Sequence, residues 1–179
     1  MYRLRELQRD DIREINTWRN NPDLIKFLGA PFRFINLDTD IRWYDNYMNN
    51  RGNAIRCAII DETQEKIVGL VSLVSIDYMN QSAELHIMIG DTSNQGKGAG
   101  TFAVRAMLEH AFNNINLHRI ELLVLADNER AKHLYEKQGF VCEGRKQKAV
   151  FKNGKFVDFL MYAILKENYK ESACGEGIK

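Results

Sequence analysis

The spacing of apolar residues over the first fifty positions predicts one short strand followed by two helices. Tyr2 to Leu7 alternates as a strand does, and Asp11 to about Arg19 has its apolar side chains at helical spacing. Asp10 stands before this helix and is placed to cap it. Pro22 should end the helix, because proline cannot continue a helix interior, and a short helical turn is expected just beyond it. Asp38 to Met48 repeats the helical spacing and predicts the second helix.

Beyond Asn50 the helical spacing gives way to short apolar runs separated by polar turns. Three of these runs have the length and the β-branched content of strands. They cover Ile55 to Ile60, Ile67 to Ile76 and Ala83 to Ile89. Because the turns between them are short, we expect the three strands to form an antiparallel meander.

The second half of the chain alternates between helices and strands. Apolar positions predict a long helix from Gly98 to Asn113 and a shorter one from Asn128 to Lys137, with Gly139 at its C-cap. Between them, Arg119 to Leu125 is almost continuously apolar, which is typical of a strand covered on both faces. The dipeptide Asn153-Gly154 favours the tight turn of a β-hairpin. The two strands of this hairpin are expected over Arg145 to Lys152 and Lys155 to Leu165.

These elements follow the order β-α-α-β-β-β-α-β-α-β-β. They predict one mixed α/β (α+β) domain over residues 1–170, with a mostly antiparallel central sheet flanked by helices. A chain of 179 residues is long enough for such a domain to bury a core. Residues 171–179 have little apolar content and are expected to be a flexible tail.

Composition excludes several classes of protein. The 25 Lys and Arg residues balance 24 Asp and Glu residues, so no overall field attracts nucleic acid or an anionic membrane. No apolar run approaches the ~20 residues of a membrane span, and no signal-peptide stretch opens the chain. Cys57, Cys142 and Cys174 are odd in number and widely spaced, which indicates neither a disulfide framework nor a metal site. We therefore expect a cytoplasmic protein.

A glycine-rich turn, Gln95-Gly96-Lys97-Gly98-Ala99-Gly100, separates the meander from the long helix. Glycines let the backbone approach a ligand closely, and the unpaired amides at the start of a helix suit a pyrophosphate. A Walker loop is excluded because GxxxxGK[ST] is absent. A dinucleotide fingerprint does not fit, because the spacing is GxGxG and the preceding strands are antiparallel. A flexible turn without a ligand is the remaining alternative.

A second motif lies on the predicted helix from Asn128 to Lys137. Tyr135 follows Asn128 by two turns at ~3.6 residues per turn, so the two side chains share one face. Ala131 lies between them and leaves room for a ligand. An N-capping asparagine and a tyrosine in the core would have the same spacing, so this motif alone does not choose between the two interpretations.

Together the two motifs resemble the GNAT family of N-acetyltransferases. Gln95 to Gly100 fits the family's coenzyme A loop, [QR]-x-x-G-x-[GA], and Asn128 to Phe140 fits its pattern N-x-x-A-x-x-[LF]-Y-x-x-x-G-F. With Ala83 to Ile87 and Phe151 to Lys155, the resemblance is greatest to ribosomal-protein N-terminal and spermidine N-acetyltransferases. It implies acetyl-CoA as the cofactor. The cofactor-binding residues that it implies are Ile87, Met88, Ile89, Gln95, Gly96, Lys97, Gly98, Ala99, Gly100, Thr101, Asn128 and Ala131.

The resemblance also implies a mechanism, in which a primary amine attacks the acetyl thioester directly in a ternary complex. Tyr135 matches the family's general acid, which protonates the departing sulfur, and backbone N–H groups near Ile87 to Ile89 polarise the acetyl carbonyl. The base stays open between residues of one strand. Glu84 could take the proton directly or through water, and His86 on the same face is the other candidate.

The acceptor amine is not decided by the residues. A polyamine such as spermidine, a peptide N-terminus and an amino sugar are all compatible, and Thr17 to Asn20 is similar to amino-sugar acetyltransferases. A different class, an acyl-CoA-binding sensory domain, would not need an acid at the position of Tyr135. A homodimer is a fair default for the assembly. The resemblance implies that the two N-terminal helices and the final hairpin shape the acceptor pocket, although a hydrophobic core with a solvated face would use the same residue types. The candidates there are the aromatic residues and one arginine Trp18, Arg19, Phe32, Trp43, Tyr44, Tyr47, Phe151 and Phe156, and the acids Asp38, Asp40, Asp45 and Asp158.

Overall fold

The computed structural model describes residues 1–169, and every predicted helix and strand is present among them. The bounds are β1 (Tyr2–Glu6), α1 (Asp11–Arg19), α2 (Pro22–Ile25), α3 (Leu37–Asn49), β2 (Ile55–Asp61), β3 (Lys66–Asp77), β4 (Ser82–Ile89), α4 (Ala99–Glu109), β5 (Arg119–Leu125), α5 (Glu129–Lys137), β6 (Val141–Lys152) and β7 (Lys155–Leu165). The predicted turn after α1 is thus a short helix, α2, so three helices precede β2. The predicted tail over residues 171–179 lies outside the described residues.

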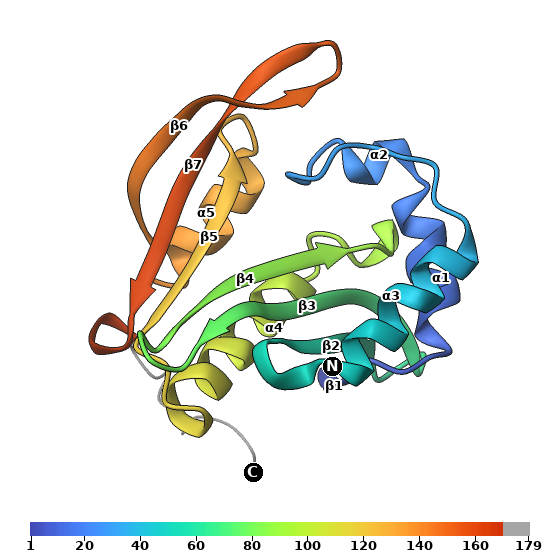
Figure 1. Ribbon diagram of the computed structural model, residues 1–179, viewed down its shortest axis with the longest axis horizontal. Coiled ribbons are helices and arrows are strands. Elements are labelled where there is room, and N and C mark those ends of the chain that lie inside the picture. The colour runs from blue at the N-terminus through green and yellow to red at the C-terminus, as the bar shows by residue number, and fades with distance from the viewer. Residues whose placement is uncertain (170–179) are drawn as a thin grey trace.

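The seven strands form one sheet in the order β1-β2-β3-β4-β5-β7-β6 (Figure 1). Neighbouring strands are antiparallel except β4 and β5, which run parallel. This arrangement confirms the predicted meander and the mixed α/β fold. The parallel pair is short: its register ends where Glu84 lies opposite Glu121. Beyond that pair β4 and β5 diverge, which opens a gap in the middle of the sheet.

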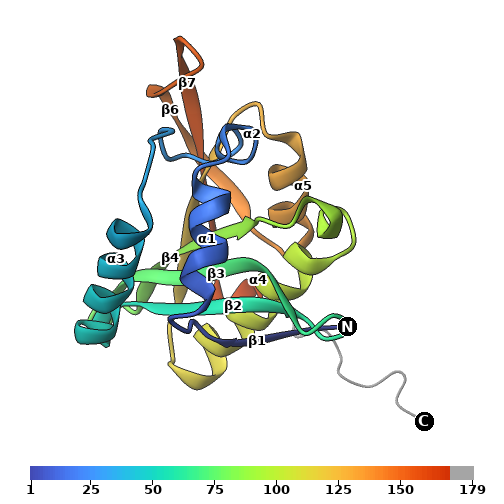
Figure 2. The ribbon, with the colours of Figure 1, turned by 90° about the vertical axis from the view of Figure 1, so that its right-hand side faces the viewer.

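Helices cover the two faces of the sheet unequally. On one face α4 and α5 pack against β3, β4 and β5 in the larger hydrophobic core. On the other face α1 and α3 cover the meander, as Figure 2 shows, in a smaller core. β4 contributes to both, because successive side chains of a strand point to opposite faces. Ala83 and Leu85 are buried with α4, whereas Glu84 and His86 are on the face of α1 and α3.

The prediction that β5 is covered on both faces is wrong. Leu123 of β5 is 45% exposed, and the Glu121 side chain on the same face is 47% exposed. The smaller core formed with α1 and α3 includes no residue of β5. The apolar run of β5 therefore has one face buried in the larger core, and its other face borders the gap between β4 and β5.

The predicted cap of α1 is also wrong. Asp10 has helical backbone angles, φ −67° and ψ −24°, and its side chain accepts no capping hydrogen bond. The Asp11 carboxylate caps no amide of α1 either: it accepts from the Gln8 N–H, before the helix, at 2.8 Å and from Arg5 of β1 at 2.7 Å. Asp11 therefore ties the start of α1 to β1 and to the loop before the helix.

The predicted turns are confirmed by their backbone angles. Gly139 ends α5 with φ +93°, and the hairpin turn has Asn153 and Gly154 at φ 48° and 80°. Positive φ at both central residues defines the type I′ turn that fits the twist of a hairpin. β6 begins at Val141 rather than at the predicted Arg145. The sequence pattern missed its start, because the side chains of its first half are largely exposed and show no apolar alternation.

Two properties of residues 1–169 bear on function. None of their helices is both long and apolar enough to cross a membrane. They also hold no cluster of three or more His, Cys, Asp or Glu side chains that could bind a metal ion.

Candidate active site

The glycine turn joins β4 to α4 in a conformation that only its glycines adopt easily. Gly96 and Gly98 have φ of 80° and 90°, in the left-handed region that a Cβ disfavours. The first hydrogen bond of α4 runs from the Phe102 N–H to the Gly98 carbonyl, at 2.9 Å. The amides of Ala99 and Thr101, and that of the intervening glycine, therefore precede the helical bonding pattern. Amides in that position bind anions such as a diphosphate.

Gly100 brings the three candidate segments into contact. A Cβ at this position would lie 2.9 Å from Leu134 Cδ1 of α5, 3.9 Å from Ile89 Cγ1 and 4.0 Å from Ile87 Cδ1 of β4. The start of α4 thus touches both α5 and the end of β4. The two sequence motifs, although 28 or more residues apart, form one continuous surface at this point.

Arg130 lies beside the glycine turn and was missed by the sequence motifs. Its Nη1 donates to Gln95 Oε1 at 3.0 Å, and Gln95 Nε2 donates to the Ile89 carbonyl at 3.2 Å. A Cβ on Gly96 would lie 4.0 Å from Arg130 Nη2. The family pattern leaves position 130 unspecified, so its positive charge was the only signal. Arg130 thus supplies a cation beside the candidate anion site, and Lys97 lies within the turn itself.

The edge of β4 facing the gap supplies further backbone donors. The Gly90 N–H donates to the Val68 carbonyl at 3.0 Å. By the alternation of an antiparallel ladder, Met88 also directs its peptide groups toward β3, whereas Ile87 and Ile89 direct theirs away from it. Since β5 has already diverged there, the amides of Ile87 and Ile89 face the gap. Met88 instead packs its side chain against the smaller core.

Tyr135 is buried on α5, with 8% of its surface exposed and its ring 5.7 Å from that of Phe140. No side chain or peptide group among residues 1–169 hydrogen-bonds its hydroxyl. Burial raises the pKa of Tyr135 to about 12, so the hydroxyl keeps its proton at neutral pH. A protonated, unpartnered hydroxyl is suited to donate a proton or hydrogen bond to a ligand.

Asn128 hydrogen-bonds both its own helix, α5, and the segment that follows α2. Its Oδ1 accepts from the Ala131 N–H at 3.1 Å, which caps α5, and its Nδ2 donates to the Phe27 carbonyl at 3.1 Å. The capping interpretation of the motif is therefore confirmed for Asn128. The hydrogen bond from Asn128 Nδ2 to Phe27 is separate from the cap and connects the two elements.

Glu84 and His86 lie side by side on the sheet face opposite α4. Glu84 Oε2 is 3.4 Å from His86 Nε2, and the two side chains are 45% and 62% exposed. Glu84 is also next to Glu121 of β5, at the point where the strands separate. The carboxylate is thus accessible from the gap, which is the position that a base or an amine anchor requires.

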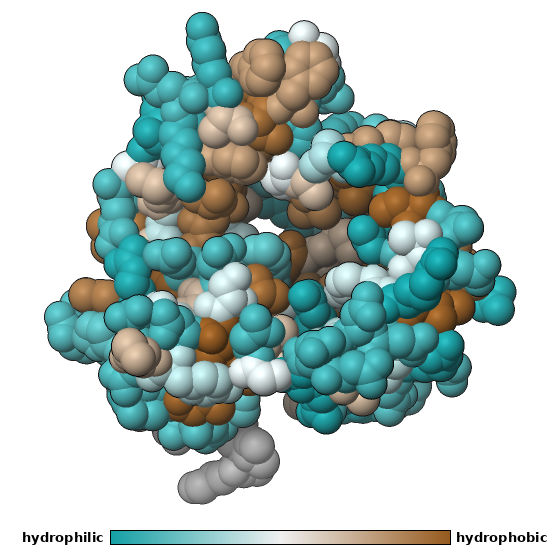
Figure 3. Space-filling model, viewed as in Figure 1, coloured by the Kyte–Doolittle hydropathy of each residue, from teal (hydrophilic) through white to brown (hydrophobic). Residues whose placement is uncertain are grey.

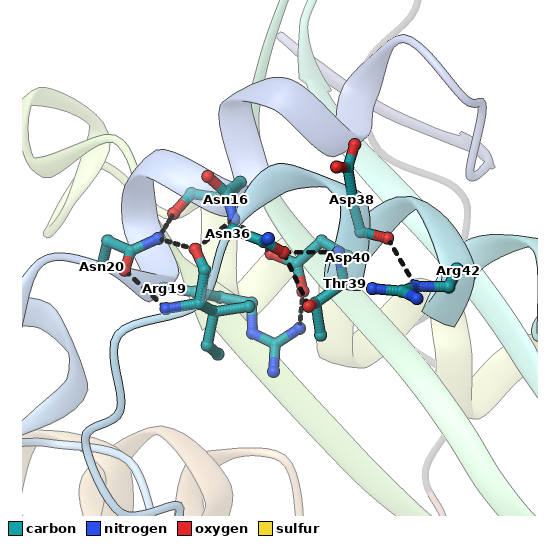
Figure 4. Close-up of polar contacts among 9 residues, drawn as sticks. Asn16, Arg19, Asn20, Asn36, Asp38, Thr39, Asp40 and Arg42 are labelled. Atoms are coloured by element: carbon teal, nitrogen blue, oxygen red, sulfur yellow. Dashed lines mark hydrogen bonds and ion pairs between the residues drawn. The ribbon is translucent and has the colours of Figure 1, made fainter.

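Arg19 ties α1 to α3, and Asn20 ties it to the segment before α3, as Figure 4 shows. Asp40 is fully buried; it forms an ion pair with Arg19 and accepts from Asn16 Nδ2 at 2.8 Å. Asn20 bonds both the amide and the carbonyl of Ile35, at 2.9 and 2.7 Å. These polar side chains are satisfied within the protein, so they shape the wall of the gap rather than present a ligand site.

Replacing Asp40 with alanine is expected to destabilise the fold by about 2 kcal/mol, because a partly buried guanidinium and a partly buried amide lose their acceptor. The value is below that of a fully buried pair since the Arg19 side chain is 34% exposed. Urea unfolding of Asp40→Ala and of the matched surface variant Asp38→Ala checks this. Equal midpoints for the two variants would contradict the structural role of Asp40.

The tip of the β6–β7 hairpin closes over α2. Lys152 is 7% exposed, and its Nζ donates to the carbonyls of Ile25 (2.9 Å) and Ala30. A Cβ on Gly29 would lie 2.9 Å from Phe159 Cζ of β7. Figure 3 shows a hollow between this hairpin and the strands below it. The open end of the gap is therefore bridged by the segment around α2.

The fold and the site define a protein that can hold a diphosphate-bearing cofactor between two diverging strands. The acetyltransferase (GNAT) domain model matches residues 2–141. Spermidine N(1)-acetyltransferase of Vibrio cholerae is 34% identical over 167 residues, covering 93% of this chain and 94% of that protein.

Two solved structures of that enzyme are similar. Spermidine N-acetyltransferase from Vibrio cholerae in complex with CoA and spermine has a TM-score of 0.88 at 33% identity, covering 94% of this chain and 97% of that one. A dodecameric structure of the same enzyme in an intermediate state has a TM-score of 0.82 at 31% identity, covering 96% and 98%. This chain belongs to the GNAT acetyltransferases. It is an acetyl-CoA-dependent N-acetyltransferase.

Proposed function

We propose that this acetyltransferase acts on the primary amine of a linear polyamine such as spermidine or spermine. The observation that carries the proposal is Glu84, a half-exposed carboxylate at the divergence of β4 and β5. Among residues 1–169 it has no lysine or arginine partner, so it is available to a cationic amine. The similarity to spermidine acetyltransferases supports the same acceptor.

The residues around the gap fit coenzyme A. Amides at the start of α4 and two cations suit its diphosphate, and the open edge of β4 suits the amide groups of its pantetheine arm. We assign the diphosphate to the Gln95–Thr101 segment with Arg130, and the arm to Ile87, Ile89, Asn128 and Ala131. When bound, acetyl-CoA supplies the acetyl thioester that the amine attacks.

Three groups of the protein then act on the reaction. Glu84 holds the incoming ammonium and takes its proton directly or through a water, with His86 beside it. The amides of Ile87 and Ile89 stabilise the charge that develops on the acetyl oxygen. Tyr135 donates its proton toward the departing sulfur, and its raised pKa keeps that proton available.

Replacing Glu84 with glutamine is expected to lower kcat/KM for spermidine about tenfold, because the amide neither attracts the ammonium nor accepts its proton. The loss should be largest below pH 8, where the free amine is scarce. Initial rates of thiol release from pH 6.5 to 9.5 measure it. The control is Glu109→Gln on the exposed surface of α4, and an equal loss in both variants would contradict the assignment.

The acceptor itself is tested by thiol release from acetyl-CoA with spermidine, followed by mass spectrometry of the product. We expect a monoacetylated polyamine. The comparisons do not support a peptide N-terminus, and the residues that suggested an amino sugar, Arg19 and Asn20, are engaged within the fold. Turnover of glucosamine without turnover of spermidine would overturn the polyamine proposal.

We also propose that the protein assembles as a homo-oligomer larger than the expected dimer. The support is the dodecameric form of its similar structure. Size-exclusion chromatography with light scattering tests this: a monomer or a dimer at micromolar concentration would contradict it.

A further inference from the structure

Arg56 of β2 is a cation without a carboxylate partner. Its guanidinium carbon lies 4.9 Å from the centroid of the Trp43 ring and 5.6 Å from that of Tyr47. Its Nε is buried with no hydrogen-bond partner, and no ion pair with a carboxylate is present among residues 1–169. Burial lowers the pKa of Arg56; the Tyr47 phenol opposes that effect and no carboxylate does. Buried polar atoms without partners are rare in native proteins.

The two rings around Arg56 are held in place by other contacts. The Tyr47 hydroxyl donates to Glu6 at 3.0 Å and accepts from the Arg56 N–H at 3.3 Å. Trp43 also has the guanidinium of Arg19 at 6.0 Å from its ring. Asp40 neutralises Arg19, but nothing equivalent neutralises Arg56. A fixed, partly desolvated positive charge therefore remains on this face of the sheet.

That charge lies on the acceptor face, in line with the proposed amine site. Arg56 pairs with Ser72 of β3, and Ser72 pairs with His86 of β4. Only β3 lies between them, so two strand spacings of ~4.8 Å place the Cα atoms of Arg56 and His86 about 10 Å apart. Glu84 is two residues from His86 on the same face. The face therefore has a carboxylate at one end and a guanidinium at the other.

We infer that Arg56, framed by Trp43 and Tyr47, is an anion subsite of the acceptor pocket. Unlike Nε, the terminal Nη atoms of Arg56 are not buried without a partner, and their planar fork matches a carboxylate or phosphate. The enzyme then takes a further class of acceptor: primary amines that carry such an anion several carbon atoms from the amine. This inference rests on the proposed transfer of an acetyl group to an amine near Glu84.

Three six-carbon amines test this acceptor class. They are 6-aminohexanoate, hexylamine and 1,6-diaminohexane, which carry an anionic, a neutral and a cationic far end. Arg56→Met keeps the apolar stem between the rings and removes the charge, Arg56→Lys keeps the charge without the fork, and Arg105→Ala removes an exposed arginine from α4. The readout is the ratio of kcat/KM for 6-aminohexanoate to that for 1,6-diaminohexane.

We expect Arg56→Met to lower this ratio at least tenfold, since a hydrogen bond to a charged group is lost and cation repulsion is relieved. Arg56→Lys should fall between Arg56→Met and the unaltered protein, and Arg105→Ala should leave the ratio unchanged. An unchanged ratio in Arg56→Met, or an equal change in Arg105→Ala, would overturn the subsite.

A binding measurement separates the subsite from the acetyl transfer. Tryptophan fluorescence reports on Trp43 when orthophosphate or 6-acetamidohexanoate is added at constant ionic strength. A saturable change that Arg56→Met abolishes supports the subsite, whether or not the amines are acetylated. If none of the amines is acetylated, the proposed function is rejected and the subsite stands. The absence of any saturable change would overturn the subsite even if 1,6-diaminohexane is acetylated.

Discussion

Replacing Tyr135 with phenylalanine is expected to lower kcat about 100-fold, which is the contribution of a well-placed general acid. The ring packing against Phe140 is kept, so the dissociation constant for CoA should change less than twofold. Rates come from thiol release with saturating acceptor, and affinity comes from calorimetry. A variant that keeps its kcat would show that another group, or water, protonates the sulfur.

Tyr162→Phe is a matched control for this variant. Tyr162 is also buried and its pKa is raised to about 12, but its hydroxyl donates to Glu136 at 2.8 Å. Its loss should reduce stability and leave kcat near that of the unaltered protein.

The pH dependence follows from the same pKa. In the proposed mechanism the protonated form of Tyr135 is the active one, and burial raises its pKa to about 12, so we expect that activity does not fall between pH 8 and pH 10. A fall with a midpoint near pH 9 would contradict the raised pKa.

Replacing Gly90 with alanine is expected to destabilise the fold by about 3 kcal/mol, as for a large overpacking of a core. The added Cβ would lie 1.9 Å from Trp18 Cδ2, and Trp18 is only 5% exposed in the smaller core. Either α1 or the end of β4 must move. At roughly 2–4 °C for each kcal/mol, the melting temperature should fall by about 10 °C.

Thermal unfolding by circular dichroism measures this change. The matched variant is Gly52→Ala, because a Cβ at Gly52 meets no atom within 4 Å and its φ is not positive. We expect that control to melt within about 2 °C of the unaltered protein. If Gly90→Ala melts there as well, Trp18 can adjust at no cost and the packing at the end of β4 is looser than described.

The fold was predictable to the extent that local pattern determines it. Strands and helices followed apolar spacing, and the turns at Gly139 and Asn153-Gly154 followed from residues that tolerate positive φ. The uncapped start of α1 was not predictable, because Asp10 has helical backbone angles in the fold, and the sequence does not distinguish these from the extended angles that a cap requires. The coverage of β5 depends on how far α1 and α3 extend across the sheet, which no local pattern encodes.

The candidate site divides in the same way. The glycine turn and the Asn128 motif are contiguous in sequence, so their spacing could be recognised. Arg130 binds Gln95 from 35 residues away, and Lys152 binds Ile25 from 127 residues away. Such pairs depend on the folded topology.

Most of the acids considered for the acceptor are paired within the fold, which the sequence could not indicate for the same reason. Asp40, Asp45 and Asp158 form ion pairs with Arg19, Arg9 and Arg145, respectively. Their partners lie 36 residues away for Asp45 and 21 for Asp40. A count of carboxylates in the sequence therefore overstates the negative charge available to an amine.

The bridge between Lys152 and the carbonyls around α2 has a consequence for the shape of acceptors. The end of β4 touches Trp18 of α1, and α1 leads into α2. Lys152 joins α2 to the hairpin, and Asn128 joins the segment after α2 to α5. β5 then pairs with β4 again at Glu84. These contacts form a closed ring around the gap. A chain can enter a closed ring only by its free end, because an internal segment cannot pass in from the side. We therefore expect amines at the tips of slender chains to react, and amines along a folded polypeptide to be left untouched.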